Sequence, residues 1–269
     1  DLATLVMRMK ENNPDRVIYL ADARQSMHFI QVFRCARKTG IVPDTTELVH
    51  IGFGTMNGKD GKPFKTRDGG VMRLEYLLKE IDDEMLNKIK ENQKEKENLN
   101  IDEAEAEQTA KTVALAAVKY GDLSNQASKD YIFDIDRFTS FEGNTGPYIL
   151  YTIVRIKSIL SKYEAKGGDI SALKDAIMPA VNAGQKNLML SLAKFNATIE
   201  SAYEESAPHK ICAYIYELAN AFNGFYHDTK ILSEENEELK KSYISLLVLT
   251  KEILEACIDM LGFSAPDRM

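Results

Sequence analysis

Residues 50–70 read HIGFGTMNGKDGKPFKTRDGG and join an apolar segment to a basic loop. The apolar side chains of Leu48, Val49, Ile51 and Phe53 predict a short buried strand. The loop after it is rich in glycine and basic residues: Gly58, Gly61, Gly69, Gly70, Lys62, Lys65 and Arg67. Glycine lets backbone N–H groups approach a ligand, and ammonium groups neutralise negative charge, so this loop suits a polyphosphate. A solvated basic hairpin is the alternative interpretation.

Helical and strand patterns alternate before this loop. Apolar spacing predicts helices at 2–11 and 26–39, and strands at 17–20 and 46–53. Such alternation is typical of a parallel α/β sheet. Because two strands alone do not bury a stable sheet, we expect this region to be the later half of a larger Rossmann-like nucleotide-binding domain.

Helical patterns dominate the rest of the chain. Helices are predicted at 72–99, 102–120, 146–165, 170–179, 186–205, 208–229 and 234–262, and residues 131–141 are expected to be extended. The predicted fold class is therefore mainly α, with a partial α/β, Rossmann-like piece at residues 1–75. An α-helical bundle is expected at residues 76–269.

Composition excludes several classes of protein. The net charge of −7 over 269 residues argues against a protein that coats nucleic acid nonspecifically, and we expect no DNA partner. No apolar run approaches the roughly 20 residues that span a bilayer, so no membrane partner is expected. Three distant cysteines fit reduced thiols in the cytoplasm and give no metal-ligand spacing. Because the first residue is Asp1 rather than Met, we expect a fragment of a longer protein.

Aromatic and guanidinium side chains share one face of the helix predicted at 146–165. Tyr148, Tyr151 and Arg155 have i, i+3, i+7 spacing. Stacking on unpaired bases requires such groups on a single face. In the alternative interpretation, the two tyrosines pack inside the bundle while Arg155 extends to solvent.

Several separated motifs resemble the arginyl-tRNA synthetases, which are class I aminoacyl-tRNA synthetases. Residues 62–66, KPFKT, are similar to the Lys-Met-Ser-Lys-Ser loop of that class, and residues 61–69 resemble the form of this loop in the arginyl branch. Gln25 and His28-Phe29 follow the Gln-x-x-His-Phe pattern of the family. The segments at 141–155, 213–226 and 260–269 resemble its helical anticodon-binding domain.

The resemblance implies roles for particular residues. Lys62, Lys65 and Thr66 would form the catalytic loop that acts on ATP, with His28 and Gly54 as further ATP-binding positions, while Asp1 and Gln25 would bind the substrate arginine. The anticodon loop would be contacted by Tyr148, Tyr151, Arg155, Tyr226 and Met269. The implied partners are ATP with Mg²⁺, L-arginine and arginine-specific tRNA, without a tightly bound cofactor or a protein metal site.

One segment resembles a second class I signature without matching it. His50-Ile51-Gly52-Phe53 lacks the last histidine of the His-Ile-Gly-His motif and is interpreted as the strand that leads into the lysine loop. The true signature is expected further upstream, so the 269 residues by themselves are expected to be inactive. The alternative functions are a stand-alone tRNA-binding module without catalysis and a purely structural helical protein.

Overall fold

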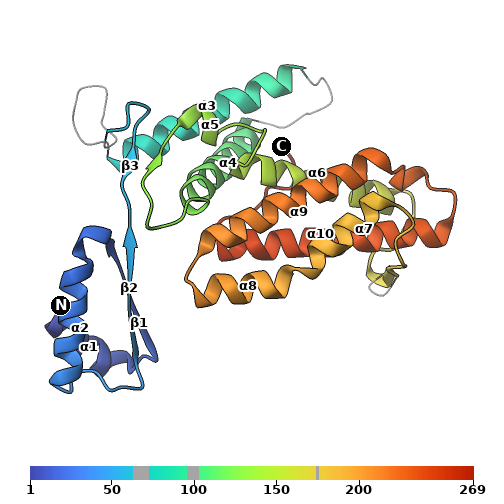
Figure 1. Cartoon of the computed structure of the whole chain (residues 1–269). Coiled ribbons are helices and arrows are strands. Elements are labelled where there is room, and N and C mark those ends of the chain that lie inside the picture. The colour runs from blue at the N-terminus through green and yellow to red at the C-terminus, as the bar shows by residue number, and fades with distance from the viewer. Residues whose placement is uncertain (63–72, 96–102, 174–175) are drawn as a thin grey trace. The chain divides into compact units, whose positions relative to one another are not determined.

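The computed structural model describes residues 1–62, 73–95, 103–173 and 176–269 (Figure 1). Two compact units divide the chain: Asp1–Phe64 with Asn125–Ile132, and Lys65–Ser124 with Phe133–Met269. In the part of the chain that is described, no helix combines the length and apolar character needed to cross a membrane.

The first unit is a small parallel α/β structure. Its elements are α1 (Leu2–Asn12), β1 (Arg16–Asp22), the 3-10 turn η1 (Ala23–Gln25), α2 (Ser26–Lys38) and β2 (Glu47–Phe53). Strands β1 and β2 pair in parallel from Arg16 opposite Glu47 to Asp22 opposite Phe53. A core of Leu5, Val17, Ala36 and Val42 joins the strands to the helices. The predicted α/β piece and its two strands are confirmed.

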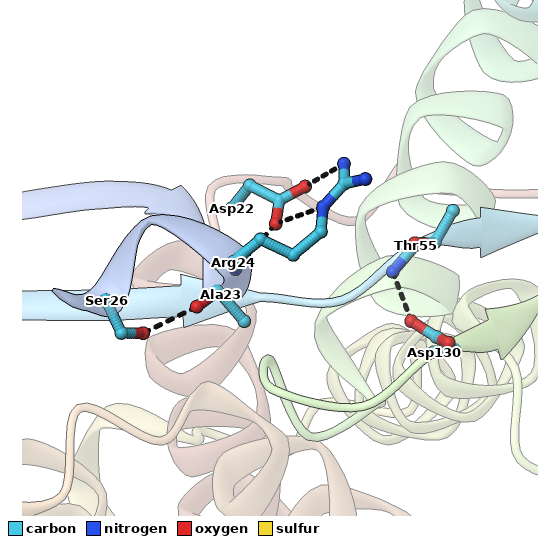
Figure 2. A network of polar contacts seen from close by, with 6 residues as sticks. All are labelled: Asp22, Ala23, Arg24, Ser26, Thr55 and Asp130. Atoms are coloured by element: carbon cyan, nitrogen blue, oxygen red, sulfur yellow. Dashed lines mark hydrogen bonds and ion pairs between the residues drawn. The ribbon is translucent and has the colours of Figure 1, made fainter. Parts of the chain in front are cut away.

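A second, shorter strand pair completes this unit. β3 (Met56–Asn57) pairs in parallel with β4 (Tyr131–Ile132), which lies far away in the sequence. Further hydrogen bonds hold the segments together. Thr55 N–H donates to Asp130 Oδ1 at 2.6 Å (Figure 2). Gly54 N–H donates to the carbonyl of Ala127 at 2.9 Å, and Tyr131 N–H donates to the carbonyl of Thr55 at 3.1 Å.

The second unit is helical. It contains α3 (Leu74–Glu95), α4 (Glu103–Leu123), α5 (Ile135–Phe138), α6 (Gly146–Ala165), η2 (Ser171–Leu173), α7 (Ala183–Ala193), α8 (Phe195–Glu204), α9 (Pro208–Asp228), η3 (Ile231–Ser233) and α10 (Glu237–Met260). Helix α6 contacts α4, α9 and α10. Its apolar faces supply much of the core, with Ile149, Ile153 and Ile156 fully buried. The predicted mainly helical class is confirmed.

The structure differs from the prediction in two of the predicted helices, 170–179 and 186–205, and in the segment 131–141 that is expected to be extended. The segment predicted as a helix at 170–179 forms only the turn η2 where it is described, because side chains of α10 take over its backbone groups. Ser245 Oγ donates to the carbonyl of Leu173 at 2.7 Å, and Met178 N–H donates to Ser242 Oγ at 2.9 Å. These bonds replace the i to i−4 bonds of a continuing helix.

The helix predicted at 186–205 is two helices, α7 and α8, which meet at Lys194. Helix α7 also begins earlier, because the Asn182 side chain caps it by accepting from Gln185 N–H at 2.8 Å. Residues 131–141 are extended only over β4 and turn into helix α5 at Ile135. Burial of Phe138 against Phe133 favours this turn, with the ring centroids 4.7 Å apart.

Candidate nucleic-acid interface

Helix α6 begins where local chemistry predicts. Thr145 caps it, since its hydroxyl oxygen accepts from Tyr148 N–H at 3.2 Å, and Pro147 occupies the first turn. Gly146 allows close packing, because a Cβ there would lie 2.3 Å from the carbonyl oxygen of Ala116 in α4. The cap and the glycine therefore fix the helix that carries Tyr148, Tyr151 and Arg155.

A directed chain of hydrogen bonds joins α6 to α9. Arg155 Nη1 donates to Asn223 Oδ1 at 2.7 Å, and Asn223 Nδ2 donates to the Tyr148 hydroxyl oxygen at 2.9 Å. The Tyr148 hydroxyl then donates to Asn220 Oδ1 at 2.7 Å. Each group uses its donor and acceptor ends without conflict, so the four side chains hold one another in place.

Aromatic rings surround the same guanidinium. The Arg155 Cζ atom lies 4.8 Å from the ring centroid of Tyr151 and 5.4 Å from that of Tyr226. The Tyr226 ring is nearly parallel to that of Phe222, with the centroids 6.0 Å apart. Tyr226 remains 41% exposed. The structure thus brings together four of the five residues predicted to contact the anticodon loop, and one of these rings is open to solvent.

The fifth predicted residue, Met269, lies at the end of a tail that α4 and α6 hold. Lys119 Nζ donates to the carbonyl of Gly262 at 2.6 Å, and Lys157 Nζ donates to Asp267 Oδ1 at 3.1 Å. Arg268 makes a two-pronged ion pair with Glu105, at 2.6 and 2.8 Å. Met269 is half-buried. Its contact with RNA stays a prediction.

Sequence reasoning missed Asn220 and Asn223. Both lie on one face of α9 with Tyr216, at i, i+4, i+7 spacing. Tyr216 packs edge-on against Tyr148 with the centroids 5.8 Å apart. Asparagine is a poor helix former, and two of them within four residues of a helix interior were the available signal.

In the first unit, the structure brings Asp1 and His28 together. His28 Nε2 lies 2.6 Å from Asp1 Oδ2, and both side chains are partly exposed. Gln25 ends the turn η1, directly after the carboxyl end of β1, and is exposed. Open parallel sheets bind ligands at this end of their strands. The roles of these three residues toward arginine and ATP stay predictions.

An ion pair precedes Gln25 in the same turn. Arg24 donates through Nε and Nη2 to the two carboxylate oxygens of Asp22, at 2.9 and 2.6 Å (Figure 2). The side-chain hydrogen bond from Arg24 lowers the pKa of Asp22 to about 2. Asp22 also caps the turn by accepting from Arg24 N–H at 2.8 Å. The turn therefore carries a carboxylate, paired with Arg24, three residues before Gln25.

Strand β2 leads toward the lysine loop as predicted. His50 on this strand stacks on Phe29 of α2, with the ring centroids 4.7 Å apart. Gly54 has a structural reason, because a Cβ there would lie 2.5 Å from the backbone of Lys129. Its predicted ATP contact stays a prediction. Lys62 is exposed, whereas Lys65 and Thr66 lie outside the described residues. Over the described ranges, no group of three or more metal-ligating side chains gathers.

A chain that combines a parallel α/β unit with a helical unit carrying an aromatic and guanidinium face fits the class I aminoacyl-tRNA synthetases. Residues 1–135 match the family described as tRNA synthetases class I (R), catalytic domain, and residues 149–269 match the DALR anticodon binding domain. The chain belongs to the arginyl-tRNA synthetase family. The predicted resemblance is confirmed.

Individual relatives agree with this assignment. The chain is 54% identical over 269 residues to an arginine–tRNA ligase of Alkaliphilus oremlandii and covers 44% of that protein. The crystal structure of arginyl-tRNA synthetase from Plasmodium falciparum matches the whole chain with a TM-score of 0.82 and 27% identity, over 44% of its own length. The Thermus thermophilus arginyl-tRNA synthetase matches 95% of the chain with a TM-score of 0.78 and 25% identity, over 41% of its own length. The chain thus spans less than half the length of these relatives.

Proposed function

We propose that the chain supplies the lysine loop and the anticodon-reading part of an arginine–tRNA ligase. This enzyme would attach arginine to its cognate tRNA in the cytoplasm, using ATP and passing through an arginyl-adenylate. Residues 1–75 would belong to its catalytic domain and residues 76–269 to a helical linker and the anticodon-binding bundle. The single observation that carries the proposal is the cluster of Tyr148, Tyr151, Arg155 and Tyr226 on α6 and α9.

This cluster has the chemistry that unpaired bases require. An exposed aromatic ring offers a stacking surface to any base, and a guanidinium offers in-plane N–H donors to base edges and phosphates. Tyr226 supplies the exposed ring. Arg155 supplies the guanidinium, and among the described residues no carboxylate pairs with it. Its charge is therefore available to RNA. Met269 would add an apolar contact from the tail.

The first unit would bind the small substrates. The Asp1 carboxylate would pair with the guanidinium of arginine, a geometry that an ammonium group does not reproduce, and Gln25 would add a hydrogen bond. Asp1 keeps acceptor capacity for this, because His28 Nε2 approaches only one of its two oxygens, Oδ2.

ATP would lie toward His28, Gly54 and the lysine loop. Lys62 and Lys65 would stabilise the charge that develops on the phosphates as the arginine carboxylate attacks the α-phosphorus, releasing pyrophosphate, and Thr66 would add a hydroxyl contact. Mg²⁺ would arrive with ATP and neutralise part of the same charge. The exposed position of Lys62 is compatible with this role.

The first experiment compares binding of arginine-specific tRNA with binding of the same tRNA carrying a changed anticodon, at two salt concentrations. We expect a clear preference for the native anticodon that persists at the higher salt, while overall affinity falls steeply with salt. Equal affinities for the two tRNAs would contradict anticodon reading by this chain.

A second experiment concerns catalysis. We expect residues 1–269 by themselves to form no arginyl-adenylate, since the His-Ile-Gly-His signature is not in this sequence and the described first unit holds only β1 and β2 with one short strand pair. ATP–pyrophosphate exchange is measured with arginine and tRNA present. Exchange above the rate of a Lys62→Ala, Lys65→Ala double variant would contradict the expectation.

A further inference from the structure

Arg155 is an uncompensated charge in an ordered position. Of the residues that the structure describes, Asn223 is the side chain that accepts a hydrogen bond from its guanidinium, at 2.7 Å. Lys157, two residues further along α6, differs in this respect: Glu255 and Asp267 both pair with it, at 3.5 and 3.1 Å. A neutral amide orients a guanidinium and leaves its charge in place. A carboxylate orients the guanidinium and also cancels its charge.

Asn223 also fixes Tyr148 through its other end. Its Nδ2 donates to the Tyr148 hydroxyl at 2.9 Å, while Asn220 accepts the Tyr148 proton at 2.7 Å. The donor and acceptor ends of one amide therefore set the positions of two side chains on α6. Neither a carboxylate nor an aliphatic group at position 223 reproduces both bonds.

Helix propensity does not explain why asparagine occupies position 223. Asn223 lies in the interior of α9 and is followed by Gly224, and both residues disfavour a helix. What the Asn223 side chain does in this fold is form hydrogen bonds to α6.

We propose that Asn223 is a positioning residue for anticodon recognition, which holds the Arg155 guanidinium in a fixed orientation while leaving its positive charge available to the RNA. This inference rests on the proposed function. If it is correct, removal of the Asn223 amide reduces discrimination between the native and the changed anticodon, rather than weakening binding of both tRNAs equally.

The test uses two substitutions of nearly equal size in the 269-residue chain. Asn223→Leu removes the hydrogen bonds to Arg155 and Tyr148, together with the longer one to Thr152, and we expect the preference for the native over the changed anticodon to fall on the order of tenfold. Asn223→Asp keeps an acceptor for Arg155 but compensates its charge. We expect it to weaken binding of both tRNAs and to reduce the slope of log affinity against log salt by about one. Asn187→Leu, at an exposed asparagine on α7, is the matched control and should change neither quantity.

Coupling to Arg155 separates positioning from a structural role. In an Arg155→Ala background, Asn223→Leu should cost less preference than it does in the unmodified chain, because one of the two side chains that it orients is gone and only Tyr148 remains. If the two substitutions reduce the anticodon preference additively, or if the preference survives Asn223→Leu, the proposed role of Asn223 is wrong while the proposed function stands. Absence of any preference in the unmodified chain would instead overturn the proposed function, and this role with it. Thermal unfolding of each variant verifies that the helical unit remains folded.

Discussion

Tyr226 combines two features in one side chain: its ring lies 5.4 Å from the Arg155 guanidinium, and 41% of its surface is exposed. The cation lies near the electron-rich face of the ring, an arrangement that is attractive by itself. A base that stacks on the exposed part of the ring would also lie close to a guanidinium. The tyrosine therefore offers a stacking surface and a neighbouring donor together.

Replacing Tyr226 with alanine should weaken binding of arginine-specific tRNA by roughly 1–3 kcal/mol if the ring stacks on a base. Tyr226→Phe keeps the stacking surface and should bind nearly as well as the unmodified chain. Tyr203→Ala removes another exposed tyrosine, 72% exposed on α8, and serves as the control. Equal affinities for the Tyr226→Ala and Tyr203→Ala variants would make Tyr226 a packing residue.

Two glycines in the helices differ in their surroundings, although the sequence alone does not distinguish them. At Gly146, an added Cβ would lie 2.3 Å from a backbone oxygen of α4, whereas at Gly224 no atom lies within 4 Å of it. Gly146→Ala should destabilise the helical unit by about 1–3 kcal/mol, because the backbone of α4 must shift.

Gly224→Ala should stabilise the same unit by about 0.5–1 kcal/mol, because alanine reduces the freedom of the unfolded chain at no steric cost. Urea unfolding of both variants measures the two free energies of unfolding. A pair of changes with the same sign would contradict the assigned packing of α4 against α6.

Helix α6 shows how far local patterns predict the fold. It spans Gly146–Ala165, as predicted, because Thr145, Pro147 and the apolar spacing all act within a few residues. The helix predicted at 170–179 is wrong because the partners of this segment, Ser242 and Ser245, lie more than sixty residues away in α10. The break at Lys194 likewise has no glycine or proline to mark it.

In the candidate interface, too, local contacts could be predicted from the sequence and distant ones could not. Tyr148, Tyr151 and Arg155 could be grouped from helical spacing alone, since they lie on one helix. The link from Arg155 to Asn223 joins residues 68 positions apart, and only packing of α6 against α9 creates it. Spacing therefore predicts which side chains share a face, but it does not predict which partners orient them.

Distant parts of the chain also meet at the C-terminal tail, where Arg268 pairs with Glu105 on α4. Glu105→Gln removes the ion pair and makes the chain one unit less negative. Electrostatics alone would then strengthen tRNA binding, whereas release of the tail that carries Met269 would weaken it. We expect weaker binding, and an unfolding free energy within about 1 kcal/mol of the unmodified chain, because the pair is partly exposed.

Glu238→Gln is the control for charge, because it removes the partner of Lys241 on the surface of α10 and changes the net charge equally. Titration of arginine-specific tRNA compares the two variants. Tighter binding by both variants would show that the tail does not contribute to recognition.

The path of the chain through Asn125–Ile132 limits how this architecture can be recombined. The polypeptide leaves the helical unit after α4, contributes β4 to the first unit, and re-enters the helical unit before α5. A chimaera with one crossover after β3 would replace β4 along with the helices. It would then pair β3 from one parent with β4 from the other. Exchange of the helical unit between relatives therefore needs three junctions, with the Asn125–Ile132 segment inherited from the same parent as β3.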